Sequence, residues 1–208
     1  METIWLGEVE YRRALEMQLS RIEQRASGEV PDALLLLTHP HVYTIGRSGS
    51  EENLLVPRET LSAEGIRVEH VGRGGDITYH GPGQLVGYPI FRMEKPDVHR
   101  FVRSIEVALI EAIEGFGIHG SRIEGLTGVW VGGRKIASIG VGIRKWVTYH
   151  GFALNVSTDL SYFRRIHLCG LVGREATSIA EVTGNAPAME EVRDAVAGSC
   201  GRLLEGFS

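Results

Sequence analysis

The stretch "GVWVGGRKIASIGVGIRKWVTYHGFALNV", residues 128–156, decides the fold. It holds three apolar runs, 128–133, 135–144 and 146–156, which are separated only by short turns of glycine and charged residues. Apolar runs of this length joined by such turns are typical of neighbouring antiparallel strands. We therefore expect an antiparallel meander of three strands.

Further strand-like runs precede the meander, and amphipathic helices frame it. The runs cover 33–39, 41–46, 67–71 and 84–91. Apolar residues recur at helical spacing over about 8–25, about 96–116 and about 187–206, which predicts three helices. In the first of these, the expected apolar stripe is Tyr11, Leu15, Leu19 and Ile22. Because strands outnumber helices and their order is mixed, the sequence predicts an α/β protein of the α+β type. Its sheet should be mixed and largely antiparallel, flanked by helices, and not doubly wound.

Composition limits the class of protein. With 208 residues, 43% hydrophobic and 23% charged, the chain fits one globular domain over 1–208. A net charge of -4 gives no general attraction for nucleic acid. The longest aliphatic run, 33–37, is too short to span a membrane. The N-terminus does not read as a secretory leader, and two cysteines make no disulfide framework. These features predict a cytoplasmic protein.

Glycines cluster in "VGRGGDITYHGPGQLVG", residues 71–87, around Asp76 and His80. Glycine lets a backbone approach a ligand closely and adopt positive φ. The glycine spacing matches neither a phosphate-binding loop nor a dinucleotide-binding loop. Composition alone leaves two interpretations open, a loop that cradles a substrate and a pair of tight turns.

The histidines and one lysine are candidates for chemistry. His39 and His41 lie two apart and would share a face of one strand, where we interpret them as polar groups at a strand end. No Cys/His ligand pattern accompanies them, so we expect no metal. Lys135 begins an apolar strand after a Gly-Gly turn. It is either a solvated charge or a pocket residue that acts as a base or activates a thiol.

The two cysteines differ in context. Cys200 lies among apolar positions at helical spacing and is expected to be a packed or half-exposed helix residue without chemistry. Cys169 lies in the loop-like "RRIHLCGLVGR", residues 164–174. It is either a small buried hydrophobe or a nucleophile. A nucleophilic thiol needs a partner, and the residues alone do not choose among the candidates His167, Lys135, His80 and His150.

Five segments, taken together, resemble the lipoyl(octanoyl) transferase family, the octanoyl-[acyl-carrier-protein]:protein N-octanoyltransferases. They are "THPHVYTIGR" (38–47), "RGGDITYHGPGQLVGYPI" (73–90), "GVWVGGRKIASIGVGI" (128–143), "WVTYHGFALNV" (146–156) and "CGLVGREATSI" (169–179). They run in the order found in that family. The resemblance implies a single catalytic domain with the fold of the biotin and lipoate protein ligases.

The resemblance also implies a site. Its catalytic pair is Cys169, which carries the acyl group as a thioester, and Lys135. The implied substrate-binding residues are Arg73, Gly74, Gly75, Asp76, Ile77, Thr78, Tyr79, His80, Ser138, Ile139, Gly140, Gly151, Phe152 and Ala153. The chain departs from the family at Leu168, where a proline usually precedes the cysteine. Proline would stiffen the loop, so this substitution puts the loop's rigidity in question.

The implied reaction transfers an octanoyl group from octanoyl-acyl carrier protein to a lysine of a lipoyl domain, the first step of endogenous lipoate biosynthesis and protein lipoylation. The implied acceptors are the lipoyl domains of 2-oxoacid dehydrogenase complexes and the glycine cleavage H protein, and neither a cofactor nor a membrane is expected to take part. Arginines that could attract acidic partners are Arg47, Arg73, Arg164, Arg165 and Arg174.

Three alternatives stay open at this point. An ATP-dependent lipoate or biotin protein ligase would share the fold but would need no nucleophilic cysteine. A non-catalytic relative would only bind acylated carriers or lipoyl domains. A lipoyl amidotransferase would use the same cysteine and lysine.

Overall fold

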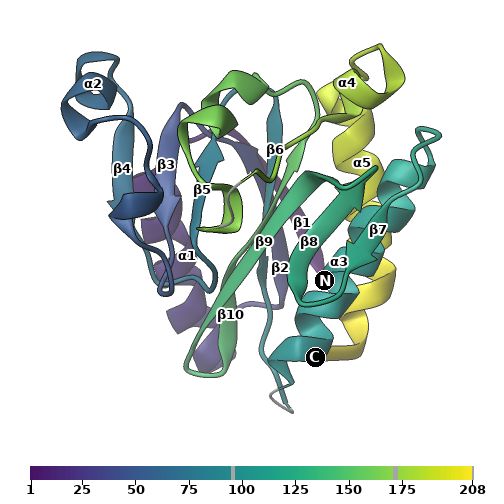
Figure 1. Cartoon of the computed structure of the whole chain (residues 1–208). Helices are drawn as coiled ribbons and strands as arrows, with labels where there is room; N and C mark the ends of the chain where they lie inside the picture. The colour runs from purple at the N-terminus through teal and green to yellow at the C-terminus, as the bar shows by residue number, and fades with distance from the viewer. Residues whose placement is uncertain (95–96, 171–172, 208) are drawn as a thin grey trace.

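The computed structural model describes residues 1–94, 97–170 and 173–207, without the side chains of Cys169 and Glu205. Within this described part, one sheet has seven strands in the order β1-β2-β6-β10-β9-β8-β7, and a second has three in the order β4-β3-β5 (Figure 1). The strands are β1 (Glu2–Glu8), β2 (Ala33–Thr38), β3 (Val42–Ile45), β4 (Arg67–His70), β5 (Ile77–His80), β6 (Gln84–Ile90), β7 (Ser121–Ile123), β8 (Leu126–Val131), β9 (Arg134–Arg144) and β10 (Val147–Asn155).

Helices cover the large sheet, and short 3-10 turns lie between β3 and the next helix and after β10. The α-helices are α1 (Tyr11–Ser27), α2 (Arg58–Ala63), α3 (Val98–Glu114), α4 (Ile179–Thr183) and α5 (Met189–Leu204). The 3-10 turns are η1 (Glu51–Asn53), η2 (Leu160–Arg165), η3 (Leu168–Gly170) and η4 (Glu205–Phe207). In the described part of the chain, no helix is long and apolar enough to cross a membrane.

The predicted meander is present. β8, β9 and β10 are antiparallel neighbours in that order, and β6 continues the antiparallel pairing to β10 and β2. Only the β1–β2 and β3–β4 pairs are parallel among the pairs of described strands. The sheet is therefore mixed and largely antiparallel, as the sequence predicts.

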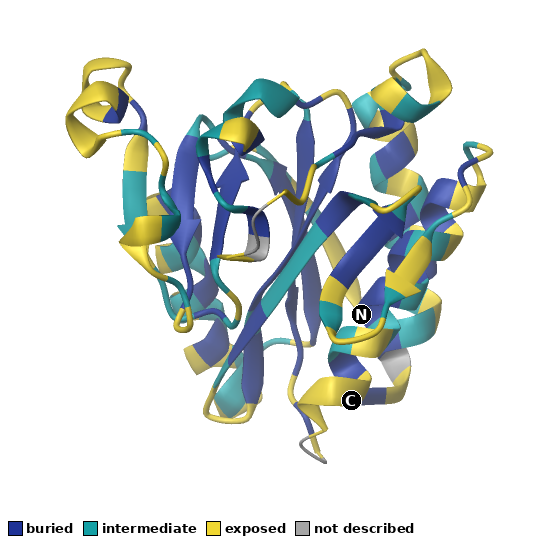
Figure 2. Ribbon diagram, viewed as in Figure 1, coloured by how far each residue is buried: buried dark blue, intermediate teal, exposed yellow. Residues whose placement is uncertain are grey.

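The large sheet is buried on both faces, which β2 illustrates. Successive side chains of a strand point to opposite faces. Leu34 and Leu36 join the core beneath α3 and α5, whereas Leu35 and Leu37 join the core beneath α1. Figure 2 shows the buried strands between these helical layers.

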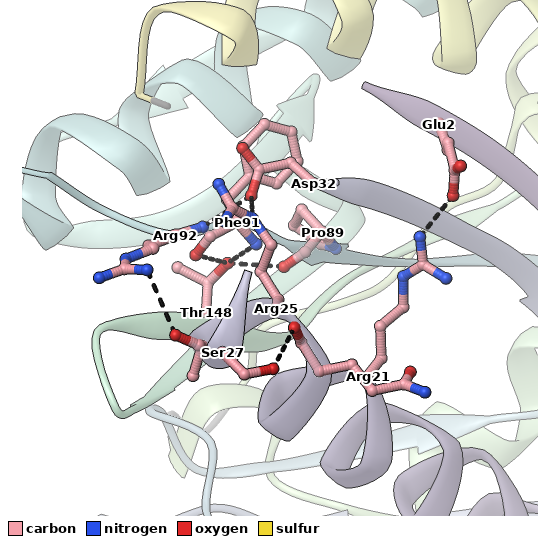
Figure 3. Close-up of polar contacts among 11 residues, drawn as sticks. Glu2, Arg21, Arg25, Ser27, Asp32, Pro89, Phe91, Arg92 and Thr148 are labelled. Atoms are coloured by element: carbon pink, nitrogen blue, oxygen red, sulfur yellow. Dashed lines mark hydrogen bonds and ion pairs between the residues drawn. The ribbon is translucent and has the colours of Figure 1, made fainter. Parts of the chain in front are cut away.

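Polar contacts attach the C-terminal half of α1 to the strands (Figure 3). Arg21 forms an ion pair with Glu2 of β1, and Arg25 forms one with the buried Asp32. The Asp32 carboxylate also accepts the Arg92 backbone N–H at 2.9 Å. Because a buried carboxylate is stable only when it is paired, these contacts fix α1 against one face of the sheet.

The structure also corrects several expectations. The predicted first helix begins at Tyr11, because β1 occupies the preceding residues as an edge strand. β5 lies inside the stretch interpreted as a loop and forms by pairing with β3. The prediction that His39 and His41 share a strand face is wrong. These residues lie between the end of β2 and the start of β3, and their rings bind different partners.

Candidate active site

A cavity of about 360 Å³ lies along β9 and β10, with β5 and the glycine-rich turn closing its other side. Its lining residues are Tyr11, Ser48, Arg73, Gly75, Asp76, Ile77, Thr78, His80, Tyr88, Gly125, Leu126, Thr127, Lys135, Ser138, Ile139, Gly140, His150, Gly151, Phe152 and Ala153. Lys135 and all the predicted binding residues except Gly74 and Tyr79 are in this lining.

Alternation along β5 explains the exception at Tyr79. Thr78 and His80 face the cavity, so Tyr79 points to the opposite face. Its ring stacks on Tyr162 with centroids 4.7 Å apart, and its hydroxyl contacts Nδ1 of His41 at 2.6 Å. Tyr79 therefore belongs to the core of the small sheet.

The glycine-rich stretch both turns tightly and lines the cavity, so its two interpretations are compatible. Gly75 has a φ of 81° and is one of the lining residues. The N–H of Gly74 donates to the Val141 carbonyl of β9 at 2.9 Å. A side chain at Gly140 would lie only 2.6 Å from the Gly74 carbonyl oxygen. The turn can therefore pack on β9 only because this position is glycine.

Arg73 is part of the cavity wall. It is 8% exposed, and its guanidinium donates to the Thr44 carbonyl at 2.7 Å and to the Thr44 hydroxyl at 2.9 Å. The expectation that Arg73 adds charge to a docking surface is therefore wrong. Arg165 is also engaged, since it pairs with Glu64 at 2.6 Å, whereas Arg164 is exposed.

Burial keeps three histidines neutral: His80 and His150, which line one end of the cavity, and His39, which lies behind them against His80. Burial lowers the pKa of His80 well below its ordinary value, and the neighbouring His39 and Arg73 lower it further. Burial lowers the pKa of His150 to about 3, with Arg73 and Arg47 adding to the effect. Burial lowers the pKa of His39 to about 4, although its hydrogen bond to the Val9 carbonyl opposes the shift. A charged ring would lose its hydration here.

His150 has an unusual backbone and a free ring nitrogen. Its φ is 54°, a region that a non-glycine residue rarely adopts and that often marks a functional position. Its N–H donates to Gln18 Oε1 of α1 at 2.7 Å. Its Nε2 is buried and has no hydrogen-bond partner among the described residues. A buried, unpaired ring nitrogen in a cavity wall is available to a water or a ligand.

Sequence reasoning missed the contribution of α1. The expected apolar stripe of this helix was Tyr11, Leu15, Leu19 and Ile22, but the buried set is Tyr11, Ala14, Gln18 and Ile22. The helix is therefore rotated so that Gln18 faces the sheet and Tyr11 reaches the cavity. A glutamine within an otherwise apolar face was the available signal.

The other end of the cavity carries Lys135. Its side chain is 3% exposed, and Nζ donates to the Thr127 carbonyl at 2.9 Å and lies 4.8 Å from the centroid of the Trp130 ring. The solvated-charge interpretation of this lysine is therefore wrong.

A register shift in β9 explains where Lys135 points. Trp130 pairs with Lys135 and Val129 pairs with Ala137, which leaves Ile136 as an extra residue. Such a β-bulge changes the direction of the side chains beside it. Without the bulge, Lys135 would share the face of Ala137. With the bulge, it lines the cavity together with Ser138.

The segment that holds Cys169 is anchored to the cavity walls on both sides. The Cys169 side chain lies outside the described residues, but its backbone forms η3. A side chain at Gly170 would lie 2.4 Å from the Asp76 carboxylate, so this backbone abuts a cavity residue. Further along the chain, the Lys135 N–H donates to the Glu175 carbonyl and the Thr177 N–H donates to the Lys135 carbonyl, both at 2.9 Å. Gly170 therefore lies beside Asp76, and Glu175 and Thr177 lie beside Lys135.

The remaining candidates have other positions. His167 is not in the cavity lining, and its N–H donates to the Asn53 carbonyl. Leu168, which replaces the expected proline, is buried in the core of the small sheet. Cys200 is buried, and burial raises the pKa of its thiol to about 12, which confirms it as a packed helix residue. Among the described residues, no group of three or more His, Cys, Asp or Glu side chains is placed to hold a metal ion.

The largely antiparallel sheet with helices on both faces defines the class, the lipoate and biotin protein ligase fold. The chain superposes with a TM-score of 0.74 and 18% identity on a chain from the structure of a bi-partite lipoate protein ligase and its E2 lipoyl domain from Thermoplasma acidophilum, covering 99% of this chain and 84% of that one. It superposes with a TM-score of 0.58 and 17% identity on the biotin protein ligase from Aquifex aeolicus, covering 100% and 70%.

Sequence comparison narrows the class to a family. Residues 10–201 match the model of the lipoyl protein ligase A/B catalytic domain, and the chain belongs to this family. An octanoyltransferase from Solibacter usitatus is 52% identical over 189 residues, which is 90% of this chain and 85% of that protein. An octanoyltransferase from Geobacter metallireducens is 47% identical over 202 residues, or 96% and 92%. The predicted fold and family are confirmed.

Proposed function

We propose that this protein is an octanoyltransferase, an acyltransferase that moves an octanoyl group from octanoyl-acyl carrier protein to a lysine of a lipoyl domain through a thioester on Cys169. The names of its curated relatives support octanoyl transfer. One structural observation supports the roles that we propose for Cys169 and Lys135. The segment holding Cys169 is anchored beside Asp76 and Lys135, two residues of a cavity that also contains most of the predicted binding residues.

The cavity walls suit an acyl chain. Ala153 and three glycines, Gly75, Gly140 and Gly151, give part of the lining without polar side chains. An octanoyl group has seven carbons beyond its carbonyl, and at about 0.8 kcal/mol for each buried CH₂ their full burial contributes roughly 5 kcal/mol. Neutral histidines at the far end cost an apolar tail less than charged ones would, because they hold less hydration to displace.

The first chemical step forms the acyl-enzyme. Lys135 takes the proton of the Cys169 thiol or stabilises its thiolate. The thiolate sulfur attacks the octanoyl carbonyl carbon, a new C–S bond forms, the C–S bond to the carrier breaks, and the carrier thiolate leaves and takes up a proton. One thioester replaces another, so this step is nearly balanced and needs no ATP.

The second step forms the product amide. The ε-amine of the acceptor lysine attacks the thioester carbon, a C–N bond forms and the bond to Cys169 breaks. The amine loses a proton and the Cys169 sulfur regains one. Amide formation from a thioester is downhill and drives the transfer. We propose as acceptors the lipoyl domains of 2-oxoacid dehydrogenase complexes and the glycine cleavage H protein, and the cytoplasm as the compartment.

The test is to mix the protein with octanoyl-acyl carrier protein without ATP, quench in acid and measure the intact mass. We expect a gain of one octanoyl group that neutral hydroxylamine removes. Cys169→Ala should abolish the adduct, whereas the matched variant Cys200→Ala should keep it, because Cys200 is buried in a helix. No adduct, together with octanoyl transfer that requires ATP and magnesium, would indicate a ligase instead. Binding without turnover would indicate a non-catalytic role.

A further inference from the structure

Glu106 is a charged side chain in the core that none of the steps above uses. It lies on α3 and is fully buried. Its Oε1 accepts the backbone N–H of Gly128 at 2.9 Å, and its Oε2 pairs with Arg103 Nη1 at 2.6 Å. A buried carboxylate is costly unless such partners satisfy it, so its contact with Gly128 calls for an explanation.

The Gly128 N–H and the Thr127 carbonyl belong to the same peptide group. That group is planar and trans, so its N–H and C=O point in opposite directions. On one side the N–H donates to the Glu106 carboxylate. On the other side the C=O accepts a hydrogen bond from Lys135 Nζ. The carboxylate, the peptide dipole and the lysine therefore form one chain in which each hydrogen bond polarises the next.

Gly128 leaves the space that this arrangement needs. Its φ is 129°, and a Cβ there would lie 2.6 Å from the Ala137 carbonyl oxygen and 2.9 Å from Cε of Lys135. The position must be glycine, which is conformationally permissive. Because glycine restricts its own backbone little, the hydrogen bond between the Gly128 N–H and Glu106 helps to fix the orientation of the Thr127–Gly128 peptide.

We infer that Glu106 is a positioning residue of acyl transfer, because through the Thr127–Gly128 peptide it holds the Nζ atom of Lys135 in place. The inference rests on the proposed function, in which Lys135 acts on the thiol. Glu106 touches neither substrate nor thiol in this scheme. Lys135 also contacts the Trp130 ring, so loss of Glu106 displaces the lysine without releasing it.

The test compares Glu106→Leu, which removes the acceptor, with Glu106→Gln, which keeps an oxygen acceptor and loses the charge. A misplaced reacting group can cost about 100-fold in rate. We expect Glu106→Leu to lower the rate of acyl-enzyme formation by about 10- to 100-fold and Glu106→Gln by about threefold, with the KM for the octanoyl donor unchanged. The matched control is Glu111→Gln on the same helix, which removes only a contact with Arg202 and should leave the rate unchanged.

A spectroscopic readout separates positioning from folding. The Gly128 amide proton donates to a charged acceptor, so its NMR resonance should move upfield in Glu106→Gln even though the fold is intact. If Glu106→Gln and Glu106→Leu form the acyl-enzyme at the parent rate, the inference is wrong. If Lys135→Ala itself leaves that rate unchanged, the proposed role of the lysine fails instead, and the two failures are thus distinguishable. Should Glu106→Leu not fold, Glu106→Gln still decides.

Discussion

The two ends of the cavity carry different ionisable side chains. At one end, Lys135 donates to the Thr127 carbonyl and lies against the Trp130 ring. At the other end, burial keeps His80 and His150 neutral, and the neighbouring Arg73 guanidinium lowers the pKa of both rings further. His150 pairs with Val141, which lies six positions beyond Lys135 on β9.

This difference indicates which end of an acyl chain each region suits. Thioester exchange develops negative charge on sulfur and oxygen, which a cation stabilises. An aliphatic tail makes no favourable interaction with a cation, and it would displace the water that hydrates the cation. Lys135 therefore suits the reacting end of the acyl chain. The neutral histidines suit the tail, and the Arg73 guanidinium beside them already donates to Thr44. Four experiments test this difference between the two ends.

The largest effect is expected from replacing Lys135. Lys135→Ala should lower the rate of acyl-enzyme formation by about 10²- to 10⁴-fold, the usual contribution of a positioned acid or base. The measurement is rapid quench followed by intact mass. Lys145→Ala, which removes an exposed lysine paired with Glu23, is the matched control and should keep the parent rate. A parent-like rate in Lys135→Ala would remove the lysine from the chemistry.

The next effect is expected midway along the cavity. Ser138 lines it and contacts the Thr78 hydroxyl at 3.3 Å. Ser138→Leu should fill space that about two methylenes of the tail occupy, which costs ~1.6 kcal/mol or about 15-fold in kcat/KM for the octanoyl donor. A butyryl donor should be affected much less. Ser138→Ala is the control with an unfilled cavity. Equal losses for both donors would show that the tail does not pass Ser138.

Much of the fold could be predicted because its signals are local. The meander follows from short turns between apolar runs, and α3 and α5 follow from helical spacing. β1 and β5 could not be predicted in this way, because their pairing partners are distant in the chain. The rotation of α1, which buries Gln18, depends likewise on its packing against β10.

The site could be predicted from the sequence only where it is formed by side chains that lie within the five family motifs. The resemblance supplied Lys135 and most of the lining, but other contributions escaped it. Tyr11 comes from α1, outside the five motifs, and Tyr88 lies within the motif 73–90 but was not among the predicted binding residues. Thr127 contributes a backbone carbonyl, which no residue type specifies. Glu106 is a single acid within an apolar helix face and resembles a surface residue until its burial is known.

The buried His39 beside the histidine end of the cavity leads us to expect that stability depends on pH. The pKa of His39 is about 4 in the folded protein and about 6.5 in an unfolded chain. Between these values the unfolded chain binds a proton that the folded protein does not. The free energy of unfolding therefore falls as the pH drops from 6.5, by up to about 1.4 kcal/mol per pH unit for this histidine.

His39→Gln should flatten that slope, because glutamine can donate to the Val9 carbonyl and accept from the Tyr88 hydroxyl but does not titrate. Urea unfolding at several pH values between 6.5 and 5 measures it. His99→Gln, which replaces an exposed histidine of α3, should keep the parent slope. An unchanged slope in His39→Gln would mean that the buried ring is already protonated in the folded protein.

The smallest effect is expected from Tyr11→Phe. This substitution tests whether the Tyr11 hydroxyl or burial keeps the His150 ring neutral. The Tyr11 hydroxyl is 3.5 Å from His150 Nδ1, too long for a strong hydrogen bond, whereas burial is the main cause that lowers the pKa of His150. Removing the hydroxyl should therefore cost less than about 1 kcal/mol of stability and leave the ring neutral. The His150 Cε1 proton resonance should not titrate between pH 8 and 5 in either protein. If that resonance titrates near pH 6.5 only in Tyr11→Phe, the Tyr11 hydroxyl rather than burial keeps the His150 ring neutral.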